Sequence, residues 1–319
     1  MAGTLSSLAP VFALIALGYL LKARAVFGAA FWDGAERLTF YFLFPALLVV
    51  SIGGADVKGL AMLPMAAALA AATLIVAGVL VWLRPRLAGR GLDGAQFASV
   101  LQGAIRPNTY VAIAVLVALY GKAGLPLAAV AIVAVIPLVN FLGIVAHLRW
   151  ARLPLGAAVA PGWGEAVVPA LKNPIIIACL VGAALNLFGF GVPPVIGPVL
   201  EIVGRAALPM GLMAVGAGLD LAAARDARAA VAGTALLNRP TSSQPFRMPA
   251  AVVVACWVFG VDGVTRSAAV LFAAMPVSAT AYVVSTQMGG DSRLMAGVVA
   301  ATTVVAAVTL PLAVMVGGP

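Results

Sequence analysis

Four residues that membrane helices rarely carry at their centre stand together in QGAIRPNTYVAIAV, positions 102–115. They are Arg106, Pro107, Asn108 and Thr109, and the segment around them is apolar enough to cross a bilayer. A cation at the middle of a span costs about 2.5–3.5 kcal/mol on insertion scales, and proline removes a helix hydrogen bond. Such residues indicate a helix that breaks and faces a polar cavity.

A second group of the same kind lies near the middle of another apolar segment. It contains Pro276, followed by hydroxyl side chains at two-residue intervals on Ser278, Thr280 and Tyr282. Because a regular helix has about 3.6 residues per turn, these hydroxyls do not all face one site, and we expect about half of them to line a pocket.

The charge of Arg106 has no acidic neighbour near the centre of any apolar segment. Glu201, the most deeply placed acid, precedes Arg205 by four residues and is expected to pair with it. Arg106 therefore binds an anionic substrate, reaches carbonyls left open by Pro107, or extends along a water-filled crevice. Asn140, another deep amide, is a further pocket residue or a hydrogen-bonding contact between helices.

The elements that must position these residues are membrane-spanning helices. Of the 319 residues, 64% are hydrophobic and 9% are charged, and the mean hydropathy is +1.14. An apolar excess along a whole chain is typical of an all-α integral membrane protein with many spans. We predict ten spans, at 5–22, 35–53, 60–82, 95–119, 126–148, 169–188, 195–219, 229–260, 266–288 and 293–316.

The eighth of these spans is irregular, because ALLNRPTSSQPFRMPAA contains two arginines and three prolines where apolar residues are expected. Irregular backbone at membrane depth must line a cavity or be buried in protein. We expect an interfacial helix that leads into a short span starting near Met248, and a reentrant break is the alternative.

Basic residues sort between alternate connections of the ten spans. Twelve lie on one side (Lys22, Arg24, Arg37, Arg84, Arg86, Arg90, Arg149, Arg152, Lys172, Arg225, Arg228 and Arg293) and three on the other (Lys58, Lys122 and Arg266). The basic side is cytoplasmic by the positive-inside rule, so both termini are predicted outside the cytoplasm of a plasma (inner) membrane. Orientation thus accounts for the net charge of +9, and no basic block or aromatic platform indicates nucleic acid.

Landmarks of the first half recur in the second half. At an offset of 164 residues the pairs are Pro10–Pro174, Gly18–Gly182, Pro45–Pro209, Gly54–Gly218 and Asp56–Asp220; at 169 they are Pro107–Pro276, Gly121–Gly290 and Leu125–Leu294. Each repeat, 1–160 and 161–319, holds five spans, and this odd number inverts the second copy. Inverted repeats are typical of secondary transporters. The matched prolines predict that the fourth and ninth helices are interrupted and cross at the midplane, with positive N-terminal ends toward an anion.

Other chemistry has little support in the sequence. His147, the sole histidine, lies beside Arg149 at the cytoplasmic end of the fifth span, where an interfacial position is the ordinary explanation. Cys179 and Cys256 lie in separate spans without metal or redox spacing, so packing is their expected role. We expect no catalytic residue, metal or cofactor. An intramembrane enzyme is therefore only a remote alternative.

Four stretches in order resemble the auxin efflux carrier family: RPNTYVAIAVLVALYGKAG, LKNPIIIACLVGAAL, RAALPMGLMAVGAGLDL and AAMPVSATAYVVSTQMGGD. They are similar to that family's fourth, sixth, seventh and ninth helices, in the family's order, and lie between residues 106 and 291. The resemblance implies a ten-helix crossover fold like that of bile-acid transporters and antiporters. Helices 1, 2, 6 and 7 would form a scaffold, often in a homodimer, and helices 3–5 and 8–10 would form a moving transport part.

The resemblance also implies elevator-type transport of a small organic anion. Plant members carry the auxin anion, and bacterial relatives are associated with malonate, malate and similar carboxylates. By position, Pro107, Asn108 and Pro276 would be crossover and substrate residues. Arg106 stands where the family usually has an apolar or small residue, which would change substrate preference. The 238–249 stretch does not look like the family's eighth helix, and the short loop after the fifth span is typical of bacterial members.

A sodium- or proton-coupled antiporter or symporter of the same architecture is the main alternative. Such carriers normally need a carboxylate at the crossing, where this chain offers Arg106 and amides. Uptake and efflux are both compatible with these residues, as is coupling to protons, to sodium or to the membrane potential.

Overall fold

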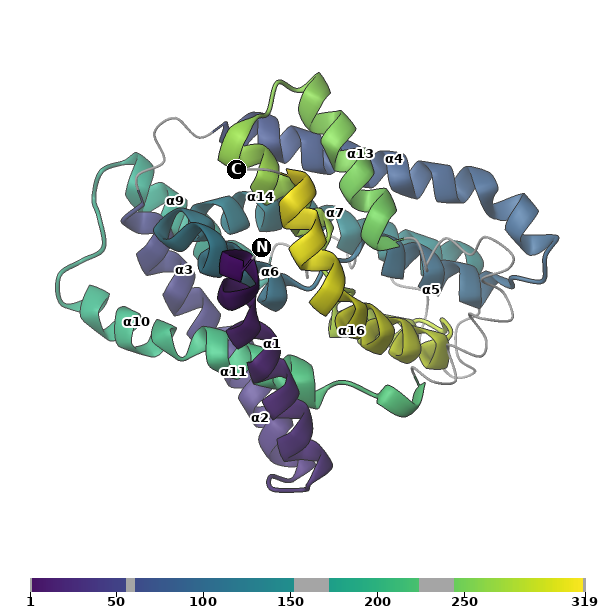
Figure 1. Cartoon of the computed structure of the whole chain (residues 1–319), viewed down its shortest axis with the longest axis horizontal. Helices are drawn as coiled ribbons and strands as arrows, with labels where there is room; N and C mark the ends of the chain where they lie inside the picture. Colours follow the sequence, from purple (N-terminus) through teal and green to yellow (C-terminus); the bar gives the residue numbers. More distant parts are fainter. Residues whose placement is uncertain (1, 56–60, 152–171, 224–243, 318–319) are drawn as a thin grey trace. The chain divides into compact units, whose positions relative to one another are not determined.

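The computed structural model describes residues 2–55, 61–151, 172–223 and 244–317, and these form helices joined by short connections (Figure 1). The helices are α1 (Ala2–Ala23), α2 (Ala29–Leu38), the π-helical turn η1 (Thr39–Leu43), α3 (Phe44–Gly53), α4 (Met62–Ala88), α5 (Gly94–Ile105), α6 (Thr109–Tyr120), the 3-10 turn η2 (Gly121–Ala123), α7 (Gly124–Trp150), α9 (Pro174–Leu187), α10 (Ile196–Arg205), α11 (Ala207–Ala217), α13 (Gln244–Val258), α14 (Gly263–Ala273), α15 (Ala279–Gln287) and α16 (Ser292–Gly317).

Within the described residues, six helical segments are long and apolar enough to cross a membrane: Ser6–Ala23, Ala29–Gly53, Met62–Ala88, Thr109–Trp150, Ile196–Ala217 and Ser292–Pro311. Shorter apolar helices cover Pro174–Leu187, Met248–Val258 and Gly263–Ala273. The protein is therefore an all-helical multi-pass membrane protein. The shorter helices arise where the predicted spans are interrupted by Pro, Gly or polar residues.

The eighth predicted span is shorter than 229–260. Its residues 229–243 lie outside the described part of the chain, as does the first half of the irregular stretch 238–249. α13 begins at Gln244, and its apolar part begins at Met248. A short apolar helix, Met248–Val258, thus begins where the short span was expected, while both readings of the preceding stretch concern mainly residues that the structure does not describe.

The chain forms two compact units, and each takes segments from both halves of the sequence. Unit 1 consists of Met1–Met62, Thr109–Val133 and Leu171–Leu219. Unit 2 consists of Leu63–Asn108, Ala134–Ala170 and Asp220–Pro319. α6 therefore belongs to unit 1, and α7 contributes to both units.

Unit 1 is held together by closely packed helix pairs. α1 packs along α11 and α3 packs along α9 (Figure 1). A Cβ atom on Gly18 would clash with the backbone of Met213, and one on Gly216 would clash with the carbonyl of Ile15. Small residues at such positions let membrane helices approach until their backbones touch, which maximises van der Waals contact between them.

Within unit 2, contacts at the N-terminal end of α5 fix the position of this helix. The Asp93 side chain accepts a hydrogen bond from the Gln96 N–H (2.8 Å), and the two residues form a capping box that satisfies the first amides of the helix. The Arg84 guanidinium of α4 lies over the rings of Phe97 and Trp150, at 5.7 and 5.6 Å from their centroids. The start of α5 is thereby fixed between α4 and the end of α7.

The C-terminal half of unit 2 packs around α16. α16 contacts α5, α14 and α15. A buried apolar cluster joins the second interrupted helix to α16, and it contains Val277, Ala281, Met295, Val298 and Val299. The segment around Pro276 is therefore supported from one side by apolar packing.

Candidate functional site

Both interruptions predicted from the proline-containing stretches are present. α5 ends at Ile105, and the next helix along the chain, α6, begins at Thr109. α14 ends at Ala273, and α15 begins at Ala279. The residues between these helices are the candidate site, because the helical hydrogen-bond pattern is interrupted there.

The two interruptions lie side by side in unit 2. Pro107 and Val277 form an isolated antiparallel β-bridge. Two backbone hydrogen bonds flank it, from the Asn108 N–H to the Pro276 carbonyl (2.8 Å) and from the Ser278 N–H to the Arg106 carbonyl (3.2 Å). We call residues 106–108 and 276–278 the crossing. Here the two chains satisfy each other's backbone groups, as membrane-embedded backbone must.

The pairing differs by one residue from the sequence match. The 169-residue offset places Pro276 opposite Pro107, whereas the bridge pairs Pro107 with Val277. Proline is tolerated at both places because the bridge hydrogen bonds are donated by Asn108 and Ser278, which keep their N–H groups.

A threonine of α16 completes the backbone pairing at the crossing. The Val277 N–H donates to the Thr302 hydroxyl (3.1 Å), and that hydroxyl donates to the Val298 carbonyl (2.8 Å). Val277 is fully buried, so its amide has no access to water. Thr302 therefore ties the second interruption to α16, a role that the sequence did not reveal.

We expect Thr302→Val to destabilise the protein by about 1–3 kcal/mol, because the buried Val277 N–H loses its acceptor. Thr303→Val is the matched control, since the buried Thr303 hydroxyl donates to the Val299 carbonyl (2.8 Å) of its own helix. Thermal unfolding of both variants in detergent measures the difference. Equal shifts in Tm would show that the Val277–Thr302 bond contributes no stability.

The predicted site residues differ in burial. Arg106 and Asn108 are buried at 9% and 3% exposure. Pro107 and Pro276 are also buried, while Thr109, Asn140 and Ser278 are half-buried and Thr280 and Tyr282 are exposed.

The crossing brings together five of the predicted residues: Arg106, Pro107, Asn108, Pro276 and Ser278. Thr280 joins them through its hydroxyl, which lies 2.6 Å from that of Ser278. Tyr282 is 43% exposed and stands one half-turn further along α15, and Thr109 opens α6 in unit 1.

Asn140 reaches the level of the crossing through α7, which runs antiparallel to α5. A Cβ atom on Gly94 would clash with the Trp150 carbonyl, and one on Gly143 would lie 3.4 Å from the Gln102 amide. This register places Asn140 beside the end of α5 that carries Arg106.

Arg106 pairs with no acidic side chain in the part of the chain that the structure describes. In contrast, Arg205 pairs with Glu201 at 2.8 Å, as predicted from their spacing, and both of these side chains are exposed. Arg106 is thus a buried cation without a counter-ion among the described residues. Burial of an unpaired charge is unusual and costs free energy.

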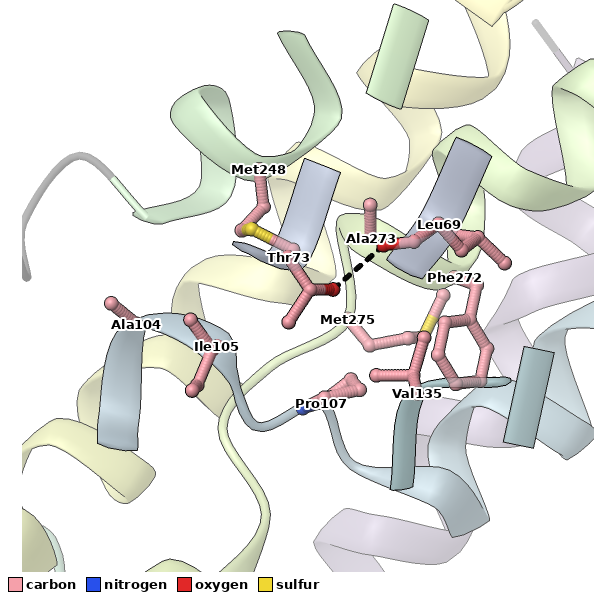
Figure 2. Close-up of a pocket in the computed structure, with 10 residues that line it drawn as sticks. All are labelled: Leu69, Thr73, Ala104, Ile105, Pro107, Val135, Met248, Phe272, Ala273 and Met275. Carbon is pink, nitrogen blue, oxygen red and sulfur yellow. Dashed lines mark hydrogen bonds between the residues drawn. The ribbon is translucent and has the colours of Figure 1, made fainter. Parts of the chain in front are cut away.

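An apolar pocket lies against the crossing (Figure 2). Ten residues line it: Leu69, Thr73, Ala104, Ile105, Pro107, Val135, Met248, Phe272, Ala273 and Met275. Among them Thr73 alone is polar, and Figure 2 shows its hydroxyl bonded to the Leu69 carbonyl of the same helix (2.8 Å). The pocket therefore suits apolar groups, and a carboxylate would find no donor in it.

His147 lies in the last turn of α7, but its side chain is buried and does not extend outward as expected of an interfacial residue. The side chain is 1% exposed, and its Nδ1 lies 2.7 Å from the Gly143 carbonyl. α7 continues as far as Trp150, so His147 faces the interior of unit 2 one turn before the helix ends. Its spacing of seven residues from Asn140 is the sequence signal that places both residues on one helix face.

Comparisons with known proteins agree with a transporter. Residues 165–314 match the family described as "Membrane transport protein". Over 315 residues, the chain is 25% identical to an "Uncharacterized transporter" of Methanothermobacter thermautotrophicus, and the match covers 97% of each chain. Neither similarity is to an enzyme. Residues 165–314 thus resemble a family of membrane transport proteins, and the chain as a whole is similar to a transporter, which agrees with the resemblance of its sequence motifs to the auxin efflux carriers.

Proposed function

We propose that this transporter carries a small organic anion, a mono- or dicarboxylate, and binds it at the crossing in unit 2. The observation that carries this proposal is the buried guanidinium of Arg106, which no described acidic residue neutralises. A carboxylate supplies the missing negative charge and matches the planar donors of arginine in a two-point contact.

The start of α15 adds to the attraction for an anion. This helix begins at Ala279, directly after the crossing, and Ser278 at its N-cap makes no side-chain hydrogen bond to the helix backbone. The N-terminus of a helix carries the equivalent of about half a positive charge. Its first amides and the Ser278 hydroxyl are donors that a carboxylate can use.

An inverted repeat underlies the arrangement in this proposal, and contacts within unit 1 support it. Gly18 packs against Met213, and Gly182 packs against Val49. At the offset of 164 residues, Gly18 corresponds to Gly182 and Val49 corresponds to Met213. The Gly18–Met213 contact is therefore the counterpart of the Gly182–Val49 contact. Two copies related by a two-fold axis in the membrane plane would produce this exchange.

The crossing has the same exchange symmetry. The two bridge hydrogen bonds interchange when Arg106 is matched with Pro276 and Asn108 with Ser278, an offset of 170 residues. Asp93 and Asp262 stand at the N-caps of α5 and α14 with an offset of 169. A single extra residue between cap and crossing in the second copy accounts for the change from 169 to 170.

In an elevator mechanism, we assign predicted helices 1, 2, 6 and 7 to the scaffold and predicted helices 3–5 and 8–10 to the moving part. Unit 1 contains the segments of predicted helices 1, 2, 6 and 7, and unit 2 contains the crossing. The scaffold would form a homodimer. The distribution of basic residues supports an orientation with both termini outside the cytoplasm of a plasma membrane.

Uptake into proteoliposomes tests the proposed substrate class. We expect saturable uptake of at least one radiolabelled carboxylate from a panel of acetate, malonate, malate and longer mono- and dicarboxylates. Sodium and a neutral sugar serve as negative controls. Saturable transport of sodium with no carboxylate transported would favour the antiporter alternative, and transport of the neutral sugar alone would contradict both.

We expect Asn108→Ala to reduce carboxylate uptake by roughly three- to tenfold, because one hydrogen bond contributes about 0.5–1.5 kcal/mol. The variant keeps the Asn108 N–H that bonds to Pro276, so the crossing itself should persist. Uptake is compared after size-exclusion chromatography has shown equal amounts of folded protein. A variant that fails to fold would instead indicate that the side chain is structural.

A further inference from the structure

A row of buried polar side chains runs along α5 from the crossing toward Gly94. It consists of Ser99, Gln102 and Arg106, which are spaced three and four residues apart and so lie on one helix face. All three are buried, and Gln102 is 0% exposed. We call this row and the facing row of α7 the polar seam.

The facing row of α7 has the same spacing. It consists of Asn140, Gly143 and His147, and Gly143 packs against the Gln102 amide. Both amide atoms of Gln102 are buried without a hydrogen-bond partner among the described residues. The Nε2 atom of His147 is also buried without a hydrogen-bond partner among the described residues. Unpaired polar atoms are rare in protein interiors, so two such side chains in one seam indicate a function.

The His147 imidazole has a defined tautomer when it is neutral. Its Nδ1 lies 2.7 Å from the Gly143 carbonyl, which only accepts hydrogen bonds, so Nδ1 carries the proton. Nε2 therefore holds a lone pair that faces the protein interior without a donor. This lone pair can accept a proton from water.

Hydroxyl groups stand beside this lone pair. A Cβ atom on Gly290 would lie 2.8 Å from Nε2 and 2.7 Å from the Ser99 hydroxyl, so both atoms lie against the open side of this glycine. The Ser99 hydroxyl donates to the hydroxyl of Ser285 (3.3 Å) and accepts from the Asp291 N–H (2.9 Å). Its oxygen is available to an imidazolium N–H.

Three charged groups face the seam from the elements around His147. Arg106 is two turns along α5 from Ser99, or about 10 Å at 1.5 Å per residue. Arg84 of α4 covers the Trp150 ring, and Asp291 lies in the turn between α15 and α16. Because Arg106 carries the charge at the crossing end, it opposes protonation of the imidazole unless an anion neutralises it.

We infer that His147 is the proton-binding site of unit 2 and that it is loaded together with the anion at the crossing. A proton from water at the Gly94 end of the unit adds to the Nε2 lone pair while a carboxylate occupies the crossing, and it returns to water after the carboxylate leaves. This inference rests on the proposed function. It makes the protein an anion–proton symporter, because each ligand favours binding of the other by the same factor.

The single histidine of the chain allows a direct measurement. With 15N-histidine-labelled protein in nanodiscs, NMR reports the tautomer and the protonation of His147 alone. We expect the Nδ1–H tautomer at high pH. A mixture of acetate, malonate and malate should raise the proton affinity of His147 by about fivefold or more. Arg106→Ala should abolish that rise.

Transport supplies a second readout. An inward proton gradient should accelerate carboxylate uptake by the wild type, and His147→Gln should lose this acceleration while Arg205→Gln, an exposed residue of unit 1, should keep it. If no carboxylate is transported at all, the proposed function fails and this inference fails with it. If carboxylates are transported but neither the gradient nor the His147 signal responds, the inference alone is overturned.

Discussion

Arg106→Ala is expected to lower carboxylate uptake by at least about tenfold, which corresponds to about 1.4 kcal/mol of lost binding. The guanidinium is buried at the crossing and has no acidic partner in the described part of the chain, so its charge is available to the substrate. The same substitution should leave the Tm of the substrate-free protein unchanged or raised, because it removes a buried unpaired charge. A fall in transport without a fall in stability distinguishes a binding role from a structural one.

Two further variants sharpen this test. Arg106→Lys keeps the charge but loses the two-point contact, so its uptake should lie between those of the wild type and the alanine variant. Arg205→Ala removes an arginine that is exposed and paired with Glu201, and its uptake should remain near that of the wild type. Unchanged uptake of every anion by Arg106→Ala would remove Arg106 from the site.

Gly216→Val is expected to have the largest effect on folding, with a loss of about 3 kcal/mol or more. A Cβ atom at this position would clash with the backbone carbonyl of Ile15 on α1. A backbone atom within a packed helix has no alternative rotamer, so α1 and α11 must separate along their contact. Because this contact is one of the two principal helix pairs of unit 1, the whole unit should be affected.

Gly78→Val is the matched control for this substitution. Gly78 also lies in a helix long and apolar enough to cross a membrane, but a Cβ atom there meets no other atom within 4 Å. The cost of placing valine in a helix is therefore the same in both variants, and only the packing differs. Fluorescence-detected size-exclusion chromatography and thermal unfolding compare them. Equal melting of the two variants would contradict close contact between α1 and α11.

The interruptions could be predicted from sequence because their cause is local. Pro107 lacks an N–H, and its ring disfavours a helical conformation of the preceding residue. The side chains of Arg106 and Asn108 are costly to bury in hydrocarbon, which offers them no hydrogen-bond partners. The same local reasoning predicted the pairing of Glu201 with Arg205, which depends only on their spacing within one helix.

Contacts between helices were not predictable in the same way. Nothing in the residues around Thr302 marks it as the partner of the Val277 amide, and the one-residue shift that pairs Pro107 with Val277 depends on where α14 ends. His147 lies close to Arg149 in sequence, which gave no sign that its side chain is buried within unit 2. Each of these outcomes is set by which face of a helix meets its neighbour.

The sequence by itself determined that this protein is a multi-pass helical membrane transporter with two interrupted helices, because composition, proline and charge act through local backbone chemistry and the cost of burial in lipid. Only the tertiary structure decided which residues meet at the crossing and along the polar seam. Most segments of these membrane helices are apolar on every side, so their sequences do not show which face meets a neighbouring helix, and even a polar row at helical spacing does not name its partner.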